Sequence, residues 1–318
     1  MAAFSQTKLA ITTADGFSLG ATLFQSQPTN ATPSLAKRIV VIINAATGAL
    51  QKFYFPFAAF LVQNGVDAVL SYDYRGIGES LPKEGTLVGF KANISDWAFW
   101  DQPAIIKYMH SRFGSTSDII LIGHSVGGHI ATINPLSKHI ARSLFVTCGS
   151  AYYAAQGLSN IPSLALAHFV LFPGFAWWYN YLPCRELGLL KIEDIPKGVA
   201  RQWSYWSRSR SYLARQPKYA KATSEWKNPL LLLSFSDDAL ISKQAISDFA
   251  SLLKSADVDW RHLDPRIDLG IESVGHMGFF FSTNQQILWK PVLSYILYGA
   301  YPVFSHSTQL HTILPAKL

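Results

Sequence analysis

Gly123-His124-Ser125-Val126-Gly127 is the stretch that decides the fold, because its flanks predict a strand, a tight turn and a helix. Before it, the apolar run Ile119-Ile120-Leu121-Ile122 is typical of a buried parallel strand. After it, residues 126–133 favour a helix, which Pro135 ends. In the pattern G-x-S-x-G the glycines let the strand and the helix approach closely around the serine. We therefore predict that Ser125 is a nucleophile held on a strained turn.

A serine at its free pKa is a weak nucleophile, so Ser125 requires a base and an acid that orients the base. The turn resembles that of the α/β-hydrolases, and this resemblance implies the chain order nucleophile, acid, histidine. The apolar strand after Pro229 runs into Asp237 and Asp238, and His276 lies in a later loop between glycines. The other late histidines are less suitable, because one lies in an alternating, strand-like run and two lie in the terminal tail: His262, His306 and His311. His276 is the predicted base.

These motifs resemble the α/β-hydrolase superfamily over most of the chain. Residues 73–80, Asp-Tyr-Arg-Gly-Ile-Gly-Glu-Ser, are similar to the D-x-R-G-x-G-x-S turn that follows an early strand in that superfamily. Other segments resemble a bacterial branch of predicted α/β-hydrolases that has no well-established substrate: 46–48, 198–203, 236–238 and 275–280. The resemblance implies an α/β-hydrolase fold, with a mainly parallel central sheet, helices on both faces and a helical cap insertion.

Two positions depart from the commonest pattern of that superfamily. Asn44-Ala45 replaces the usual His-Gly after the third strand, but an oxyanion hole uses backbone amides, so we expect Ala46 and Val126 to supply it. The acid is doubled, and counting from Pro229 along the family pattern P-x-L-x-x-x-G-x-x-D favours Asp238 over Asp237.

Three charged residues of the 73–80 motif, Asp73, Arg75 and Glu79, are interpreted as ties within a turn rather than as a second site. His124 and His129, which flank the nucleophile, are interpreted as packing or solvent-side residues.

Apolar patterning predicts alternating strands and helices along most of the chain. Strands are expected over 8–13, 17–24, 38–43, 66–72 and 143–148, and helices over 51–63, 95–113 and 285–298. Alternation resumes at Leu230. Such alternation favours a parallel sheet covered by helices on both faces.

The segment 151–228 interrupts this pattern and is predicted to be a cap inserted into a core formed by 1–150 and 229–318. Residues 143–184 contain no Asp, Glu, Lys or Arg, and 161–182 approaches the length and hydrophobicity of a membrane span. Residues that disfavour a continuous helix break this run: Pro162, His168, Pro173, Gly174 and Asn180. We therefore expect an apolar cap that lines the site, with interfacial attachment of the cap to a membrane as the alternative. Four tryptophans are the expected substrate-binding residues: Trp177, Trp178, Trp203 and Trp206.

The second half of the cap is basic, with eight Lys or Arg residues and one Glu between Lys197 and Lys227. The plainest interpretation is a solvated face. The alternative is attraction to an anionic membrane surface or to acidic substrates. No nucleic-acid-binding module accompanies the charge, so nucleic acid is not an expected partner.

Composition favours one large enzyme domain of 318 residues. The two cysteines, Cys148 and Cys184, have no metal-ligand spacing and suit a reducing cytoplasm, and the N-terminus has no secretory pattern. No metal or cofactor is expected, and the oligomeric state is left open. The predicted function is a serine hydrolase acting on an apolar carboxylic ester, with thioesters and amides as further substrates. The alternatives are an acyltransferase and a non-catalytic lipid-binding protein on the same fold.

Overall fold

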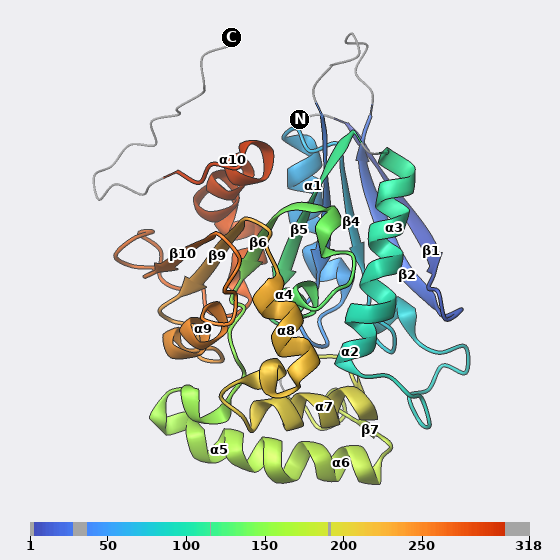
Figure 1. Cartoon of the computed structure of the whole chain (residues 1–318), viewed down its shortest axis with the longest axis vertical. Helices are drawn as coiled ribbons and strands as arrows, with labels where there is room; N and C mark the ends of the chain where they lie inside the picture. Colours follow the sequence, from blue (N-terminus) through green and yellow to red (C-terminus); the bar gives the residue numbers. More distant parts are fainter. Residues whose placement is uncertain (1–2, 28–36, 115, 190–191, 303–318) are drawn as a thin grey trace.

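The computed structural model describes residues 3–27, 37–114, 116–189 and 192–302, and its centre is an eight-stranded sheet (Figure 1). The strand order is β1-β2-β4-β3-β5-β6-β9-β10. The strands are β1 (Phe4–Thr12), β2 (Ser18–Ser26), β3 (Arg38–Asn44), β4 (Ala68–Tyr72), β5 (Ser117–His124), β6 (Ile140–Val146), β9 (Leu230–Phe235) and β10 (Val258–Leu263). β1, β2 and β4 pair antiparallel, and every other pairing in this sheet is parallel.

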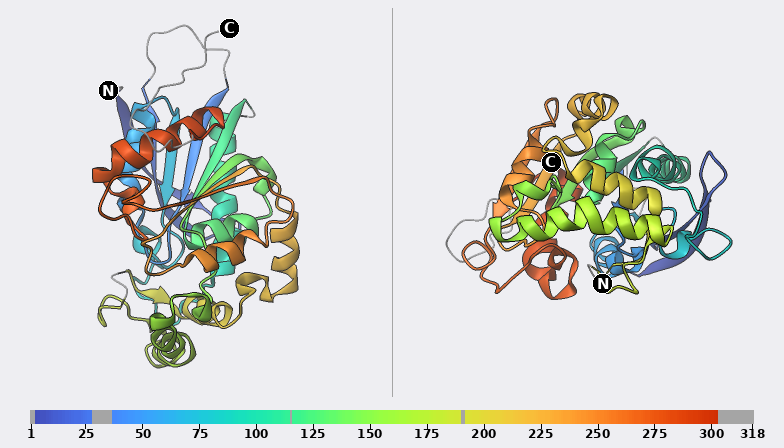
Figure 2. Two further views of the ribbon diagram at one scale, coloured as in Figure 1. Left: turned by 90° about the vertical axis from the view of Figure 1, so that its left-hand side faces the viewer. Right: turned by 90° about the horizontal axis from the view of Figure 1, so that it is seen from below.

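Helices cover both faces of the sheet (Figure 2). One face carries α1 (Phe55–Gln63) and α10 (Lys290–Tyr298), and the other carries α3 (Gln102–Phe113) and α8 (Pro217–Glu225). The remaining core helices are α2 (Ile94–Asp96), α4 (Val126–Thr132) and α9 (Lys243–Ala250). Because the central strands are covered on both sides, their side chains are buried almost without interruption, as in β4 and β9. The predicted fold class is confirmed.

The turn after β4 is fixed by buried charge, as the sequence motif predicts. Asp73 accepts hydrogen bonds from the amides of Gln51 and Glu79, at 2.7 and 2.9 Å. Arg75 is buried between two carboxylates, with its Nε 2.6 Å from Asp101 and its Nη1 2.6 Å from Asp15. The arginine thereby ties the β1–β2 turn to the start of the α3 helix.

The cap leaves the sheet after β6 and returns at β9. Its outermost element is one helix built from α5 (Ile161–Leu166), a π-helical turn (Ala167–Leu171) and α6 (Phe172–Trp178). The expectation that Pro162, His168 and Pro173-Gly174 interrupt this run is wrong. Pro162 stands in the first turn, where its missing N–H has no partner to lose. The wider π-turn precedes Pro173, which removes the need for an N–H at that position.

Two further helices connect this outer helix to the core. α7 (Lys197–Ser207) packs along α6 and the π-turn, and the short strands β7 (Tyr181–Leu182) and β8 (Ile195–Pro196) pair antiparallel beside it. α8 then packs on the core, with Tyr219 tilted against Phe99 and with Thr223 3.2 Å from Thr132. Cap and core therefore share one hydrophobic cluster.

Candidate active site

Ser125 occupies the sharp turn between β5 and α4 in a strained conformation. Its φ of 53° and ψ of −118° lie in a region that non-glycine residues rarely adopt. The turn is held because the Ser125 amide donates to the Val146 carbonyl at 3.0 Å. A side chain at Gly123 would lie 2.6 Å from the Gly128 nitrogen, and one at Gly127 would collide with the Asn44 carbonyl. Glycine at both positions is therefore a steric requirement of this turn.

His276 and Asp238 form a hydrogen-bonded pair. The His276 Nδ1 lies 2.8 Å from Asp238 Oδ2, and both side chains are largely buried. The other oxygen, Asp238 Oδ1, accepts the amides of Leu240 and Ile241 at 2.8 and 3.0 Å. A carboxylate only accepts, so His276 donates this hydrogen bond from Nδ1.

Asp237 has a different position and does not contact the imidazole. Its carboxylate accepts the amides of Val274 and Gly275 at 2.8 and 3.0 Å, which anchors the loop that carries His276. The two adjacent acids thus have different partners. Asp238 binds the imidazole of His276, and Asp237 binds the backbone amides that precede it.

A buried chain of hydrogen bonds connects three loops around the turn. The His124 Nε2 lies 2.9 Å from the His276 carbonyl, which can only accept, so this nitrogen carries the proton. Burial lowers the pKa of His124 well below its ordinary value, so the ring is neutral and its Nδ1 accepts. Tyr54 therefore donates its hydroxyl proton to that Nδ1 at 2.9 Å. In turn, the Tyr54 oxygen accepts the Ala46 amide at 2.8 Å.

This chain of hydrogen bonds includes one of the predicted oxyanion donors. The Ala46 amide, which we expect to serve an oxyanion, is bonded to the buried Tyr54 in this structure. Val126 is the first residue of α4, and an amide at that helix position has no partner within the helix. Tyr54 and the role of His124 were missed by the sequence reasoning, because hydrogen bonds between residues 8 and 70 positions apart leave no local pattern.

Ser125 lies next to this network rather than inside it. The rings of His124 and His276 are 5.3 Å apart, which brings the base loop beside the turn. Among the residues that the structure describes, no hydrogen bond joins the Ser125 hydroxyl to His276, so that bond stays a prediction. Such bonds are often long before a substrate binds.

The competing histidines have structural partners. His262 lies in β10 and its Nδ1 is 2.9 Å from the Ser234 hydroxyl, as expected of a strand residue. His129 is buried, not solvent-facing, with its Nε2 2.9 Å from the Gly149 carbonyl. His306 and His311 lie outside the described residues.

The structure places the four tryptophans predicted to bind substrate within the packing of the cap or on its surface. Trp177 and Trp178 are 70% and 72% exposed on the outermost helix of the cap. Trp206 is fully buried and packs on Tyr212 and Tyr219, and Trp203 packs on His168 and Phe172. Two of the four tryptophans therefore pack inside the cap, and the other two lie on its outer surface.

An aromatic cluster lies beside the loop that carries His276. Phe280 packs on both Tyr54 and His124, with ring centroids 4.8 and 4.9 Å apart. Phe53 joins Phe280 to Phe281, which is 49% exposed. Leu240 is also exposed, on the turn whose amides bind Asp238.

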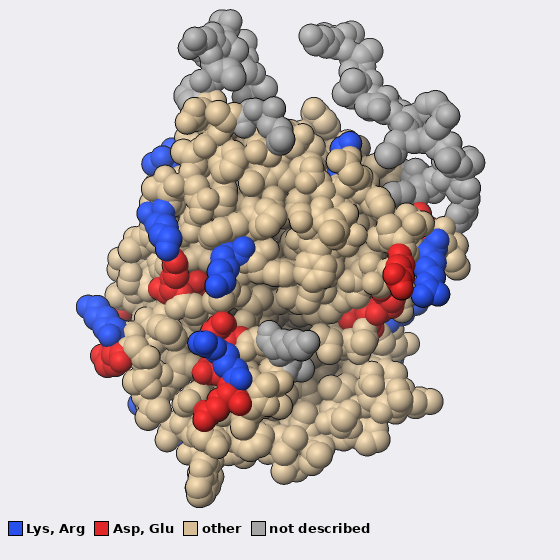
Figure 3. All heavy atoms as spheres, turned by 180° about the vertical axis from the view of Figure 1, so that it is seen from behind, with Lys and Arg blue, Asp and Glu red and all other residues tan. Residues whose placement is uncertain are grey.

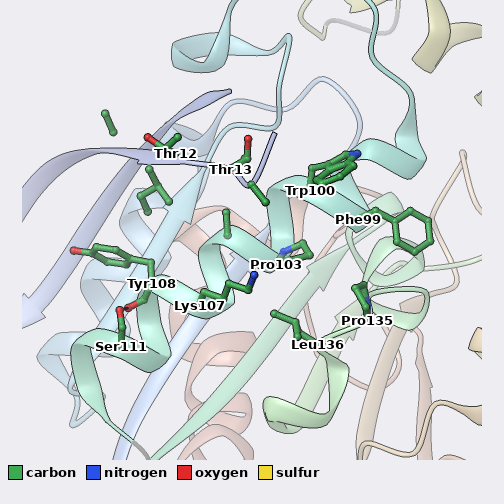
Figure 4. A pocket seen from close by; sticks show the side chains of 14 residues that line it. Thr12, Thr13, Phe99, Trp100, Pro103, Lys107, Tyr108, Ser111, Pro135 and Leu136 are labelled. Atoms are coloured by element: carbon green, nitrogen blue, oxygen red, sulfur yellow. Dashed lines mark hydrogen bonds between the residues drawn. The ribbon is translucent and has the colours of Figure 1, made fainter. Parts of the chain in front are cut away.

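Two cavities in the described part of the structure lie away from the turn, and the larger of them lies on the core. It measures about 640 Å³ and is lined by the end of β1 and by the α3 side, with Trp100, Lys107 and Tyr108 around it (Figure 4). The smaller, of about 190 Å³, lies between the 76–87 loop and β7. Neither includes Ser125, Asp238 or His276.

Comparisons with known proteins agree with this architecture. An esterase from Pyrococcus furiosus superposes with a TM-score of 0.58 at 18% identity, covering 94% of this chain and 92% of its own. Est1E from Butyrivibrio proteoclasticus, solved with ferulic acid, gives 0.58 at 16% identity over 91% and 98%. A thermostable carboxyl esterase from Bacillus coagulans, solved with glycerol, gives 0.62 at 12% identity over 92% and 98%.

No curated protein sequence matches the chain. The family model described as the alpha/beta hydrolase family matches residues 16–287, most of the chain. With the strained serine turn and the sheet order already described, this match supports hydrolytic chemistry. The chain belongs to the alpha/beta hydrolase family.

Proposed function

We propose that the protein is a serine hydrolase that cleaves an apolar carboxylic ester through an acyl-enzyme, with Ser125, His276 and Asp238 as its catalytic residues. The observation that carries the proposal is the His276–Asp238 pair held beside a serine in a strained turn. Strain of this kind is retained only where the surroundings enforce it, and it concentrates at reactive sites.

The geometry supports a definite division of roles. His276 Nε2 takes the proton of Ser125 while Oγ attacks the ester carbonyl, and then returns the proton to the leaving alcohol. Asp238 keeps the imidazole in the tautomer that leaves Nε2 free and stabilises the imidazolium that forms. Water then repeats the cycle on the acyl-enzyme, releasing the acid.

The Val126 amide is the proposed first donor to the oxyanion. Ala46 can become the second only by exchanging its bond to Tyr54 for one to the oxyanion. Before the substrate binds, the hydrogen bond to Tyr54 would hold the loop that carries Ala46 in place. We infer that the oxyanion hole completes itself on substrate binding.

Aromatic side chains beside His276 support an apolar substrate. An acyl chain placed along Phe281 and Phe53 would gain roughly 0.8 kcal/mol for each methylene that it buries. Activity toward p-nitrophenyl esters should therefore rise from acetyl through hexanoyl to octanoyl. Phe281→Ala should flatten this rise, whereas Phe169→Ala, at a similar exposure of 46% on the outer cap helix, should leave it unchanged.

The decisive experiment is labelling with a fluorophosphonate together with ester hydrolysis. Ser125→Ala should abolish labelling and lower the rate by several orders of magnitude. Ser150→Ala, which changes another buried serine, is the matched control and should keep both. Labelling of Ser125→Ala at the wild-type level would contradict the proposal. If ester cleavage in the presence of an added alcohol gave mainly the new ester, the enzyme would be an acyltransferase instead.

A further inference from the structure

The outermost cap helix exposes large apolar side chains to solvent. Its exposed large side chains follow one another at helical spacing and form what we call the outer stripe: Leu158, Leu166, Phe169, Val170, Trp177 and Trp178. A surface helix ordinarily buries its apolar face and turns charged residues to solvent. Only 17% of the most apolar part of segment Leu158–Trp178 is buried, although the segment has the length and composition to cross a membrane.

The same helix is fixed to the cap along its inner side, which opposes a transmembrane placement. His168, Phe172 and Ala176 are buried against the rest of the cap, and Trp203 of α7 packs on the first two. Arg208 also donates to the His168 carbonyl from Nε and Nη2, at 3.1 and 2.6 Å. Spanning a bilayer would break all of these contacts, whereas lying in its surface would break none.

Positive charge runs alongside the outer stripe. Lys197, Arg201 and Arg208 are spaced by four and seven residues, which brings them to one side of α7, because 3.6 residues complete a helical turn. Lys197 donates to Asn180, just beyond α6, and the Arg208 guanidinium lies 4.8 Å from the Phe169 ring centre. Within the described residues, none of the three cations has a carboxylate partner.

The surroundings of the stripe carry little opposing charge. Residues 143–184 include no Asp or Glu, and the next carboxylates in the chain are Glu186, Glu193 and Asp194. Glu193 lies 3.5 Å from Arg185, and Asp194 accepts the Arg185 amide. Seen from behind, the bottom margin of the molecule, where Figure 1 places α5 and α6, is uncharged, and a cluster of acidic and basic residues lies just above it (Figure 3).

We propose that the outer stripe docks in the plane of an anionic lipid membrane, with Lys197, Arg201 and Arg208 facing its headgroups. Interfacial helices combine an apolar face buried at the headgroup–acyl boundary with flanking Lys or Arg, and tryptophans favour that depth. A second copy of this chain fits the surface less well. An antiparallel two-fold pairing of the stripes, with its axis across the helix, would bring the two rows of cations toward each other.

The test is sedimentation of the full chain with sucrose-loaded vesicles, which needs no catalytic turnover and stands whether or not Ser125 is the nucleophile. The wild type should bind phosphatidylcholine vesicles containing phosphatidylglycerol, more weakly as salt rises, and pure phosphatidylcholine vesicles less well. Val170→Glu should lower the binding constant roughly tenfold or more, through lost apolar burial and added repulsion. Arg201→Gln should lower it about fivefold.

Matched variants on the far side of the molecule keep the result specific. Tyr298 is 64% exposed at the end of α10, a helix that lies in the half of the molecule away from α5 and α6 (Figure 1). Arg38 is exposed at the start of β3, at the sheet edge opposite the one where the cap leaves β6. Tyr298→Glu and Arg38→Gln should bind vesicles as the wild type does. Circular dichroism and solution ester hydrolysis show whether each variant is folded.

Two results would overturn the proposal. One is equal binding of the wild type and a folded Val170→Glu to anionic vesicles, including the case in which neither binds. The other is a wild-type dimer without vesicle affinity that Val170→Glu converts to a monomer, which would assign the stripe to a second copy of the chain.

Discussion

Asp237 and Asp238 are adjacent in the chain, yet their contacts predict different consequences of the same substitution. Asp238→Asn should lower kcat by on the order of 10³–10⁴, because an amide favours the wrong imidazole tautomer and does not stabilise the imidazolium. Asp237→Asn should lower it less than about tenfold, since an amide oxygen still accepts the Val274 and Gly275 amides. Steady-state kinetics on both folded variants checks this. Equal losses would mean that the acids share one role.

Tyr54 supports the site through hydrogen bonds to Ala46 and His124, and we do not expect it to contact the substrate. Tyr54→Phe leaves the buried Ala46 amide and the His124 Nδ1 without partners, so unfolding free energy should fall by about 1–3 kcal/mol. Tyr74→Phe loses a single bond, to the Ala45 carbonyl, and should be milder. Urea denaturation followed by tryptophan fluorescence measures the difference. Equal stability of the two variants would show that the hydrogen-bond chain is not a structural tie.

The sequence predicts site residues where they belong to a local pattern, and it does not reveal residues whose role depends on contacts between distant segments. Ser125 is predicted from a strand, glycines and a helix, and Asp238 from a count along the family pattern that starts at Pro229. Tyr54 could not be found in this way, because its importance depends on β3 and β5 lying side by side. The occupied Ala46 amide escaped prediction for the same reason: a backbone donor has no sequence signature.

Among the elements, the junction of β5 with α4 tolerates the least change. Gly127→Ala would press a methyl group on the Asn44 carbonyl and force α4 away from β3, which should destabilise the fold by about 1–3 kcal/mol or more. Gly174→Ala is the contrasting variant, because nothing lies within 4 Å of its added methyl group and alanine favours helix. It should be neutral or stabilising by up to about 1 kcal/mol in a thermal melt. A stable, active Gly127→Ala would contradict the close approach at this junction.

The strands and core helices were predictable as elements because their burial is regular, whereas their order in the sheet is known only from the structure. The cap was harder. Its proline and glycine predicted an interruption where the chain inserts a π-turn and continues. Its tryptophans were assigned to a pocket because apolar side chains are usually buried, and the outer stripe is an exception to that rule.

Arg75 connects separate parts of the whole molecule, and its acidic partner predicts how stability depends on pH. The hydrogen bonds from Arg75 lower the pKa of Asp15 to about 2 in the folded chain, against about 3.9 when unfolded. A lowered pKa means that ionised Asp15 stabilises the fold above pH 4 and that this contribution disappears as pH falls toward 2. The stability difference between the wild type and Asp15→Asn should therefore shrink over that range. Urea titrations at pH 5, 3 and 2 measure it, and a constant difference would exclude the linkage.

The placement of the cap has a consequence for how the enzyme meets its substrate. The cap is inserted between β6 and β9, beyond the carboxyl ends of the strands, and Ser125 follows the carboxyl end of β5. If the outer stripe rests on a bilayer, the same end of the molecule faces the lipid, and an ester dissolved there reaches the serine by lateral diffusion. The rate of hydrolysis would then depend on the mole fraction of ester in the membrane surface rather than on its bulk concentration. Diluting the ester with inert anionic lipid at constant total ester should slow the enzyme, the surface dilution expected of catalysis confined to two dimensions.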